Sequence, residues 1–309
     1  MLLRLLIFIV FSSFIQADLE DHFKKAEGKT PVCQMRNIDF IYVINLDQRP
    51  EKFAQVSREL NPFGIFPYRF SAVNGWELSL ETINDVGVKF KTGMISLFAT
   101  TYPLEAMGSC SNEFMVEGNR TYFAHCFTKG ALGICLSHIS VLKDAWDSGY
   151  ETIWVMEDDV VAVSNPQVLS DLIDRLDALV GRENWDVLFT DQDTKGSDGN
   201  YVPAQGVAKR PDMNFSLQER FSEKYTVQRR LSADFKLITA RFGAYSMILR
   251  RSGIGKLLQF ALEHKIFLPY DMDNYSAPGL KRYALNYDVV GALIGAPSDN
   301  GVAGYLGDP

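Results

Sequence analysis

The run from Phe40 to Ile44 constrains the fold more than any other part of this 309-residue chain. Its five consecutive side chains are all aromatic or β-branched, which is typical of a strand buried on both faces in a parallel sheet. A helical pattern follows at once, and we expect Asp47 to cap that helix and Pro50 to lie in its first turn. This strand–helix order is typical of an α/β domain.

The same alternation of strands and helices recurs along the chain and extends the α/β prediction. Apolar residues at helical spacing, such as Leu132, Leu136 and Ile139, predict the helices. Together the elements predict a mostly parallel sheet flanked by helices, with insertions near 77–128 and 192–236. The further expected strands are 68–73, 152–156, 185–190, 244–249 and 282–287, and the further expected helices are 131–147, 166–179 and 252–264, with Ser252 capping the last one.

Residues 1–17 differ from the rest of the chain because they are strongly apolar and carry one charged side chain, Arg4. The apolar run is shorter than the roughly 20 residues that a transmembrane helix needs. With the small residue Ala17 before Asp18, it is typical of a signal peptide, and we expect export. The alternative is a short membrane anchor that is not cleaved. Residues 18–36 are polar and form the predicted linker.

The charge balance limits the possible partners of the chain. Its 31 basic and 38 acidic residues give a net charge of −7, which argues against nucleic acid as a partner. The most basic segment, 207–241, holds eight basic and four acidic residues. Such a segment is either a solvated face or a lid that meets phosphate.

Three carboxylates, Glu157, Asp158 and Asp159, follow directly after the expected strand 152–156. Ligands of α/β sheets bind at the carboxyl ends of the strands, where these side chains lie. Residues i and i+2 of an extended backbone point the same way, so Glu157 and Asp159 can face one site together. Two hard oxygen ligands suit Mn²⁺ or Mg²⁺, which would neutralise a departing nucleotide diphosphate. The alternative is a turn and helix-cap cluster, in which aspartate is common.

Other polar side chains near strand ends are candidates for substrate contacts or proton transfer. Asp191 and Asp193 repeat the i, i+2 spacing and are an alternative metal or substrate site. Asp271 and Asp273 have the same spacing before a short helix, where they are either a general base or a helix cap in a solvated loop. His138 either hydrogen-bonds a substrate or a neighbouring acid, or is a buried histidine with satisfied partners.

The turn after the first strand has the residues of a nucleotide site. Asn45 and Asp47 lie where nucleotide-binding α/β folds contact the nucleoside or the diphosphate, and Arg49 supplies a cation for phosphate. The chain contains neither GxGxxG nor GxxxxGK[ST]. These absences argue against dinucleotide oxidoreductases and P-loop NTPases.

These residues occur in an order that resembles glycosyltransferase family 25. The resemblance covers about residues 38–300, and its motifs stand in the family's order. Two departures fall in one motif, where Ala131 replaces the usual acidic residue and Cys135 is displaced by one position. The matching stretches are 43–50 (VINLDQRP), 71–75 (SAVNG), 130–138 (GALGICLSH), 157–159 (EDD), 242–246 (FGAYS), the pair Asp271 and Asp273, and 298–299 (SD).

The resemblance implies a GT-A-like fold and an inverting transfer from a UDP-sugar, most often UDP-galactose, with Mn²⁺ or Mg²⁺ as cofactor. Because the motifs span the chain, we expect one domain over residues 37–309. The implied acceptors are a glycan, a lipo-oligosaccharide or a hydroxylated protein such as collagen. The implied metal ligands are Glu157 and Asp159, the implied donor-binding residues are Asn45, Asp47, Arg49, Ser137, His138 and Asp158, and the implied base is Asp271 or Asp273, with Asp191 as alternate.

The departure at Ala131 keeps a second class of function open, a catalytically weak secreted effector that binds a nucleotide or a glycan. A third class is a nucleotidyltransferase, which would release pyrophosphate instead of a nucleoside diphosphate. For a transferase, the apolar leader predicts a secretory lumen, into which nucleotide sugars are imported. The alternative is membrane association through residues 1–17.

Overall fold

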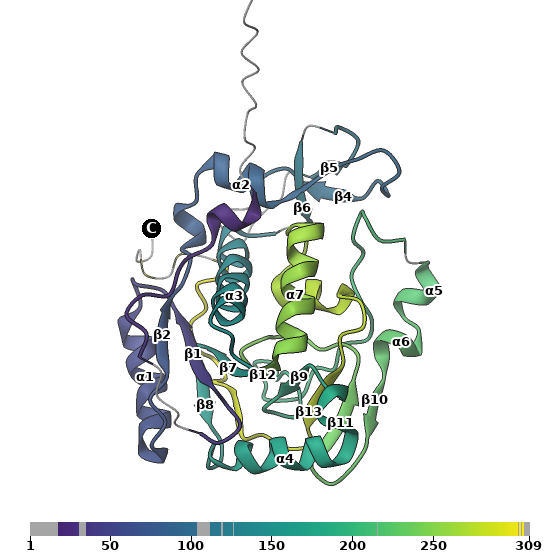
Figure 1. Ribbon diagram of the computed structural model, residues 1–309. Coiled ribbons are helices and arrows are strands. Elements are labelled where there is room, and N and C mark those ends of the chain that lie inside the picture. The colour runs from purple at the N-terminus through teal and green to yellow at the C-terminus, as the bar shows by residue number, and fades with distance from the viewer. Residues whose placement is uncertain are drawn as a thin grey trace, which may run out of the picture.

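The computed structural model describes residues 18–30, 35–103, 112–118, 120–125, 127–214, 216–301, 303 and 305. Its centre is an eight-stranded sheet in the order β10-β11-β13-β9-β12-β7-β1-β2 (Figure 1). Six strands of this sheet run in one direction, and β11 and β12 run the opposite way, which confirms the predicted mostly parallel sheet. The strands are β1 (Phe40–Asn45), β2 (Tyr68–Ser71), β7 (Thr152–Glu157), β9 (Val187–Phe189), β10 (Gln228–Arg230), β11 (Phe235–Ile238), β12 (Ser246–Arg250) and β13 (Arg282–Leu285).

Side chains of β1 alternate between two apolar layers, because successive residues of a strand point to opposite faces. Tyr42 and Ile44 pack in the layer of helices α3 and α7, whereas Ile41 and Val43 pack in the layer of α1 and α4. Helices therefore cover both faces of the strand, which explains why its residues are apolar without alternation. The four helices are α1 (Pro50–Leu60), α3 (Lys129–Asp147), α4 (Val168–Val180) and α7 (Arg251–His264).

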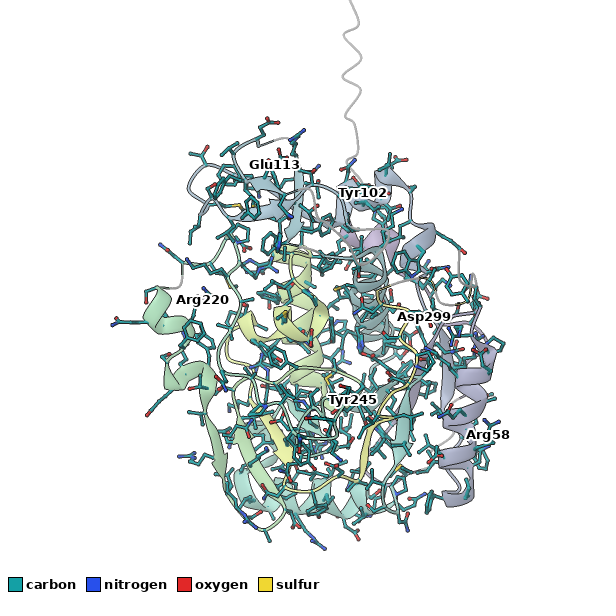
Figure 2. The ribbon with its side chains drawn as sticks, turned by 180° about the vertical axis from the view of Figure 1, so that it is seen from behind. Arg58, Tyr102, Glu113, Arg220, Tyr245 and Asp299 are labelled. Atoms are coloured by element: carbon teal, nitrogen blue, oxygen red, sulfur yellow. The ribbon has the colours of Figure 1, made fainter. Side chains whose placement is uncertain are left out.

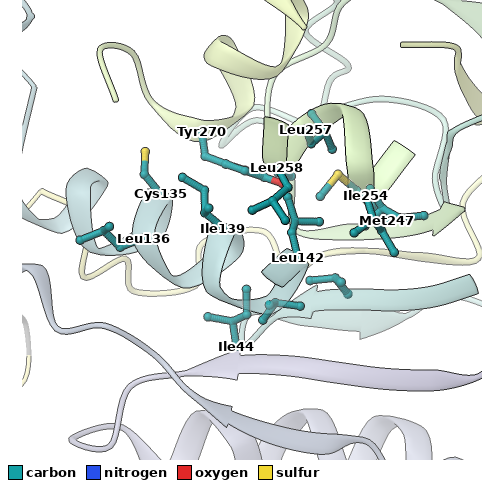
Figure 3. Packing of buried hydrophobic residues seen from close by; sticks show 14 of the residues in the cluster. Ile44, Cys135, Leu136, Ile139, Leu142, Met247, Ile254, Leu257, Leu258 and Tyr270 are labelled. Atoms are coloured by element: carbon teal, nitrogen blue, oxygen red, sulfur yellow. The ribbon is translucent and has the colours of Figure 1, made fainter. Parts of the chain in front are cut away.

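The apolar layer between α3, α7 and the sheet holds α3 in place (Figure 3). Cys135 and Ile139 lie on the side of α3 toward Tyr270, and Leu142 continues the same stripe toward Ile254 of α7. Cys135 is a buried free thiol. Each such apolar side chain contributes roughly 1.5–3 kcal/mol through burial. The position of α3 is therefore strongly determined.

The predicted insertion 77–128 contains a separate antiparallel sheet in the order β3-β6-β4-β5. Its small core includes Val88 and Tyr122 and is shared with Phe267 of the main domain. The backbone N–H of Ala124 also donates to Phe267 O at 2.8 Å, which joins the two parts. The elements here are α2 (Leu80–Val86), β3 (Val88–Lys89), β4 (Phe98–Thr100), β5 (Glu113–Phe114) and β6 (Thr121–Ala124).

The second predicted insertion, 192–236, adds β10 to the edge of the main sheet. Its basic residues do not form one solvated face or lid, because Arg210 is fully buried against Asp273. Arg241, just beyond the insertion, is likewise buried against Asp191. The remaining elements are α5 (Leu217–Arg220), α6 (Glu223–Thr226), α8 (Tyr270–Asp273), β8 (Val160–Ala162), β14 (Val290–Ala292), and the 3₁₀ helices η1 (Leu19–His22), η2 (Asn61–Phe63), η3 (Gly75–Glu77), η4 (Arg182–Asn184) and η5 (Asn274–Ser276).

Residues 18–30, which belong to the predicted linker over 18–36, pack on the domain. Leu19 is fully buried in the α3 layer, and the side chain of Asp18 caps η1. The backbone N–H of Lys24 donates to Ser140 Oγ at 3.0 Å. Residues 1–17 lie outside the described residues, so the signal peptide or anchor stays a prediction. In the described parts of the chain, no helix has the length and apolar character to cross a membrane.

Two of the predicted helix caps are wrong. The N-cap of α1 is Arg49, and the Asp47 carboxylate accepts hydrogen bonds from Arg69 and Ser71 instead. The helix expected from 252 begins one residue earlier, and Ser252 Oγ donates to a side chain outside the helix. In both cases the side chain that was expected to cap the helix hydrogen-bonds instead to a residue that is distant in the sequence.

Candidate active site

A cleft lies where the carboxyl ends of β1, β2 and β7 meet the N-terminal half of α3. Open α/β sheets bind ligands at this edge, because loops after the strands bring side chains together there. Figure 2 shows Asp299, from the C-terminal segment, between α1 and α3 at this edge. The cleft is bordered by Ile44, Leu46, Lys52, Val73, Asn74, Trp76, Gly130, Ile134, Ser137, His138, Glu157, Asp158, Asp159 and Asp299, among others.

The acidic triplet stands at the end of β7 and borders this cleft. Burial raises the pKa of Asp159 to about 7, and repulsion from Glu157 and Asp158 adds to the effect. Asp159 Oδ1 is buried and has no hydrogen-bond partner among the residues that the structure describes. Burial also raises the pKa of Asp158, which accepts a hydrogen bond from Asn45 Nδ2 at 2.6 Å. Buried carboxylates that repel one another are stabilised by a proton or by a cation, and Lys52 Nζ lies 3.9 Å from Asp158 Oδ1.

The donor set fits a metal ion whose coordination is completed by substrate. Among the residues that the structure describes, no three His, Cys, Asp or Glu side chains converge on one metal position. Mg²⁺ at phosphate-transfer sites commonly uses one or two carboxylates, with phosphate oxygens and waters in the other positions, and Mn²⁺ prefers the same oxygen ligands. Glu157 and Asp159 provide two carboxylates, and the partnerless Asp159 Oδ1 is an oxygen that a cation can bind.

His138 lies on the buried side of α3 with 2% of its surface exposed, and it reaches the acidic triplet. Its Nε2 is 3.0 Å from Glu157 Oε1. The Tyr270 ring stacks on the imidazole with a centroid distance of 4.1 Å and an interplanar angle of 12°. His138 is therefore a buried histidine that contacts a neighbouring acid, which fits two of the predicted alternatives.

Small residues let α3 approach its neighbours closely. A Cβ at Gly133 would lie 2.7 Å from Val73 O, and Ser137 Oγ accepts a hydrogen bond from Val73 N at 2.8 Å. A Cβ at Gly130 would lie 2.5 Å from Asn300 O. Backbone atoms therefore meet at distances that only glycine permits. Ser137 borders the cleft, but its hydroxyl is used to join α3 to the chain after β2.

Asn45 and Asp47, both predicted to bind the donor, share Arg69 as a hydrogen-bond partner. Arg69 Nε donates to Asn45 Oδ1 at 2.6 Å, and Arg69 Nη2 donates to Asp47 Oδ1 at 2.9 Å. Asn45 is 1% exposed and also contacts Asp158, so it links β1 to the acidic triplet. The residues of this turn that border the cleft are Ile44 and Leu46.

Arg49, predicted to bind phosphate, contacts a carboxylate of the same chain. Its Nη1 lies 2.7 Å from Asp299 Oδ1, and Lys52 Nζ lies 3.0 Å from Asp299 Oδ2. Trp76 Nε1 donates to Asp299 O at 3.0 Å. The C-terminal segment, residues 298–300, is thereby fixed along the cleft. Neither Lys52 nor Trp76 was predicted from the sequence. Lys52 could have been found, because it lies one helical turn after Arg49, and this spacing places the two side chains on one helix face.

Two of the three candidate bases are held in buried ion pairs. Asp191 contacts Arg241 at 2.7 and 3.2 Å and accepts a further hydrogen bond from Tyr245. Asp273 pairs with Arg210 through one oxygen and accepts two backbone N–H groups through the other. Breaking such a pair leaves a buried charge and costs roughly 3–5 kcal/mol. Both carboxylates are therefore engaged in holding loops together.

Asp271 takes part in none of the ion pairs among the described residues. Its carboxylate accepts hydrogen bonds from Gly243 N at 2.7 Å and Met272 N at 3.0 Å. Burial raises the pKa of Asp271 above its usual value, and the charge of Glu157 adds a smaller effect. A raised pKa brings a carboxylate closer to the range in which a general base works well.

Comparison with known proteins points to one family. The profile of glycosyltransferase family 25, described as LPS biosynthesis protein, matches residues 38–273. A "Glycosyltransferase 25 family member" of Aedes aegypti is 28% identical over 143 residues, and one of Drosophila melanogaster is 29% identical over 142 residues. Each alignment covers 46% of this chain and 19% of the relative.

A mouse relative carries a different name, "Inactive glycosyltransferase 25 family member 3", and is 26% identical over 153 residues. That alignment covers 49% of this chain and 21% of the relative. The chain therefore matches about a fifth of the length of these relatives. The profile match is far longer and runs from before β1 to the end of α8, through α3 and the acidic triplet. The family resemblance is thus confirmed, and the chain belongs to glycosyltransferase family 25.

Proposed function

We propose that this chain is an active, metal-dependent glycosyltransferase that moves a hexose, with galactose expected, from a UDP-sugar to a hydroxyl group. Membership of family 25 supports glycosyl transfer in general. The observation that supports metal-dependent use of a diphosphate donor is the pair of Glu157 and Asp159. Both border the cleft at the end of β7, and Asp159 presents a buried oxygen that has no hydrogen-bond partner in the described parts of the chain.

In this proposal the donor occupies the cleft. Its nucleoside packs on the apolar wall of Ile44, Leu46 and Trp76, and its diphosphate points toward Glu157 and Asp159. A Mn²⁺ or Mg²⁺ held by these two carboxylates would stabilise the charge that develops on the leaving diphosphate. Asp158 binds Asn45 and so fixes the turn that carries both proposed ligands.

Asp271 is the proposed base. It accepts the proton of the acceptor hydroxyl while that oxygen attacks the anomeric carbon of the sugar. The new carbon–oxygen bond forms on the face opposite the diphosphate, and the old bond breaks with its electron pair going to the diphosphate, which inverts the anomeric centre. The lack of an ion pair at Asp271 among the described residues supports this choice, because Asp273 pairs with Arg210 and Asp191 pairs with Arg241.

The test is a product assay with the full-length protein, Mn²⁺ and a panel of nucleotide sugars. We expect UDP release from UDP-galactose, with loss of metal-dependent release in the double variant Glu157→Gln, Asp159→Asn. Asp171→Asn, in an exposed ion pair on α4, is the matched control and should retain release. Metal-dependent release that survives the double variant, or pyrophosphate as the product, contradicts the proposal.

The second candidate is a nucleotide- or glycan-binding protein without turnover. Ala131, which is buried in the first turn of α3, stands where the family resemblance leads us to expect an acidic residue. Relatives from mouse and human are named inactive. Tight UDP binding with no UDP release from any donor, in the same assay, would favour this candidate.

For the transferase we propose a glycan, a lipo-oligosaccharide or a hydroxylated protein as acceptor. We propose the secretory lumen as its compartment, with membrane anchoring through residues 1–17 as the alternative. The support is the apolar leader in the sequence. Determining the N-terminus of the mature protein separates cleavage after Ala17 from a retained anchor.

A further inference from the structure

The contact between His138 and Glu157 crosses from the middle of α3 to the end of β7. The imidazole is 2% exposed, and its Nε2 lies 3.0 Å from Glu157 Oε1. This hydrogen bond restricts the rotamer of the Glu157 side chain, which is 27% exposed and borders the cleft. The position of His138 is itself determined, since Ser137 and Gly133 lock the same stretch of α3 against Val73.

His138 also contacts Tyr270, on the side of the site that carries Asp271. The Tyr270 ring stacks on the imidazole, with a centroid distance of 4.1 Å and an interplanar angle of 12°. Tyr270 is the first residue of α8 and directly precedes Asp271. Asp271 is held in turn by Gly243 N–H at 2.7 Å. One imidazole therefore contacts both the acidic triplet and the segment that carries Asp271.

We propose that His138 is a positioning residue that fixes Glu157 through its hydrogen bond and Asp271 through the stacked Tyr270. The proposal rests on the proposed function, in which Glu157 holds a cation and Asp271 accepts a proton. It changes the role of His138 from a donor-binding residue to the link between the donor and acceptor sides of the site. Partners that orient a metal-binding side chain commonly change metal affinity by about 10- to 100-fold when they are removed.

The first experiment separates the hydrogen bond from the stack with two variants of His138. His138→Gln keeps an amide N–H near the position of Nε2 and loses the aromatic ring, whereas His138→Phe keeps a ring and loses the hydrogen bond. The readout is the affinity for Mn²⁺ in the presence of UDP, measured by EPR of the free ion without any acceptor. We expect His138→Phe to weaken Mn²⁺ binding about 10- to 100-fold. We expect His138→Gln to restore most of that loss.

A double-variant cycle guards this test against simple misfolding. In the Glu157→Gln background, His138→Phe should change Mn²⁺ affinity by less than about twofold, because the hydrogen-bonded carboxylate is already gone. If His138→Phe does not fold, His138→Asn, which is smaller and too short to reach Glu157, takes its place. Equal Mn²⁺ affinity in the wild type and the hydrogen-bond-deficient variant overturns the proposal alone. A wild type that binds no Mn²⁺ with UDP overturns the proposed function and this proposal together.

The second experiment tests the link to Asp271 with Tyr270. Tyr270→Phe keeps the stacked ring, and Tyr270→Leu removes it while the site stays apolar. We expect kcat for transfer to fall at least tenfold further in Tyr270→Leu than in Tyr270→Phe, with a smaller difference in Mn²⁺ affinity. Equal kcat values in the two folded variants would show that the stack does not position Asp271.

Discussion

The guanidinium of Arg49 and the carboxylate of Asp299 form a 2.7 Å ion pair, although 250 residues separate them in the chain. Both side chains are largely buried, at 12% and 8% exposed. Lys52 contacts the other oxygen of the same carboxylate at 3.0 Å. The ion pair joins the start of α1 to the C-terminal segment and so completes one wall of the cleft.

Asp299→Asn should destabilise the protein, because the largely buried Arg49 and Lys52 lose the carboxylate that they share. Glu51, at 2.6 Å from Arg49, and Asp158, at 3.9 Å from Lys52, remain as their acidic partners. We expect a loss of roughly 2–4 kcal/mol in the free energy of unfolding, near the lower end for a broken buried pair. Urea unfolding at constant pH measures it. The exposed pair of Arg36 and Asp171 supplies the control, since Asp171→Asn should leave the midpoint unchanged. Equal midpoints for the two variants would show that the pair does not hold the segment.

Asp271→Asn should lower kcat about 10²- to 10⁴-fold, the usual range for loss of a general base, with a much smaller change in KM for the donor. Because burial raises the pKa of Asp271, the acid limb of the wild-type pH–kcat profile should lie above the usual range of an aspartate. Activity should then fall as the pH drops through that limb. Steady-state kinetics at several pH values provides the measurement.

The matched comparison for Asp271→Asn is Asp191→Asn, at the alternative base. Asp191 is 2% exposed and paired with Arg241, so its replacement should mainly reduce stability, by roughly 3–5 kcal/mol. A folded Asp191→Asn enzyme with the kinetic defect expected of Asp271→Asn would move the base to Asp191.

Gly133→Ala should push α3 away from the chain that follows β2. The added Cβ would lie 2.6 Å from Gly75 N and 2.7 Å from Val73 O, and backbone atoms cannot move aside cheaply. We expect a loss of roughly 1–3 kcal/mol in urea unfolding, together with weaker UDP binding. Gly255→Ala in α7 is the control, because its Cβ meets only the half-exposed Trp146 ring and alanine favours the helix by about 1 kcal/mol. A loss of stability in Gly133→Ala no larger than in Gly255→Ala contradicts the close approach.

Asp212 should contribute a pH-dependent part of the stability. Burial works to raise the pKa of Asp212, but hydrogen bonds and charge from His264 and Arg210 outweigh it and lower the pKa to about 2. The folded pKa is below the ordinary value of 3.8, so the unfolded chain takes up the proton first as the pH falls. The stabilisation is therefore full above the ordinary value and is lost as the pH falls through about 2.

Urea unfolding of Asp212→Asn and wild type at several pH values tests this contribution. At pH 6 we expect the variant to be less stable by on the order of 1–2 kcal/mol, after allowance for solvent screening. The difference should shrink between about pH 4 and pH 2. A difference that stays constant over this range would mean that Asp212 does not titrate as its surroundings require.

The main elements of the fold could be predicted from the sequence, because a strand that is buried on both faces has a continuous run of apolar residues. The apolar runs of β1 and β7 predicted the central strands, and the stripe of Leu132, Leu136 and Ile139 predicted α3. The acidic triplet was predicted to be a candidate site because it lies at the end of such a strand. The sequence did not predict that β11 and β12 run in the opposite direction, because an apolar strand has the same composition in either direction.

The sequence alone was thus sufficient to predict the family and the set of acidic candidates. Only the tertiary structure decided which of these acids lie in buried ion pairs. Glu157 and Asp159, Asp191 and Asp193, and Asp271 and Asp273 share one local spacing. They differ because Arg241 and Arg210, 50 and 63 residues from their partners, neutralise Asp191 and Asp273. Local patterns describe which side a residue faces, whereas the charge beside it depends on chain segments that meet only when the protein folds.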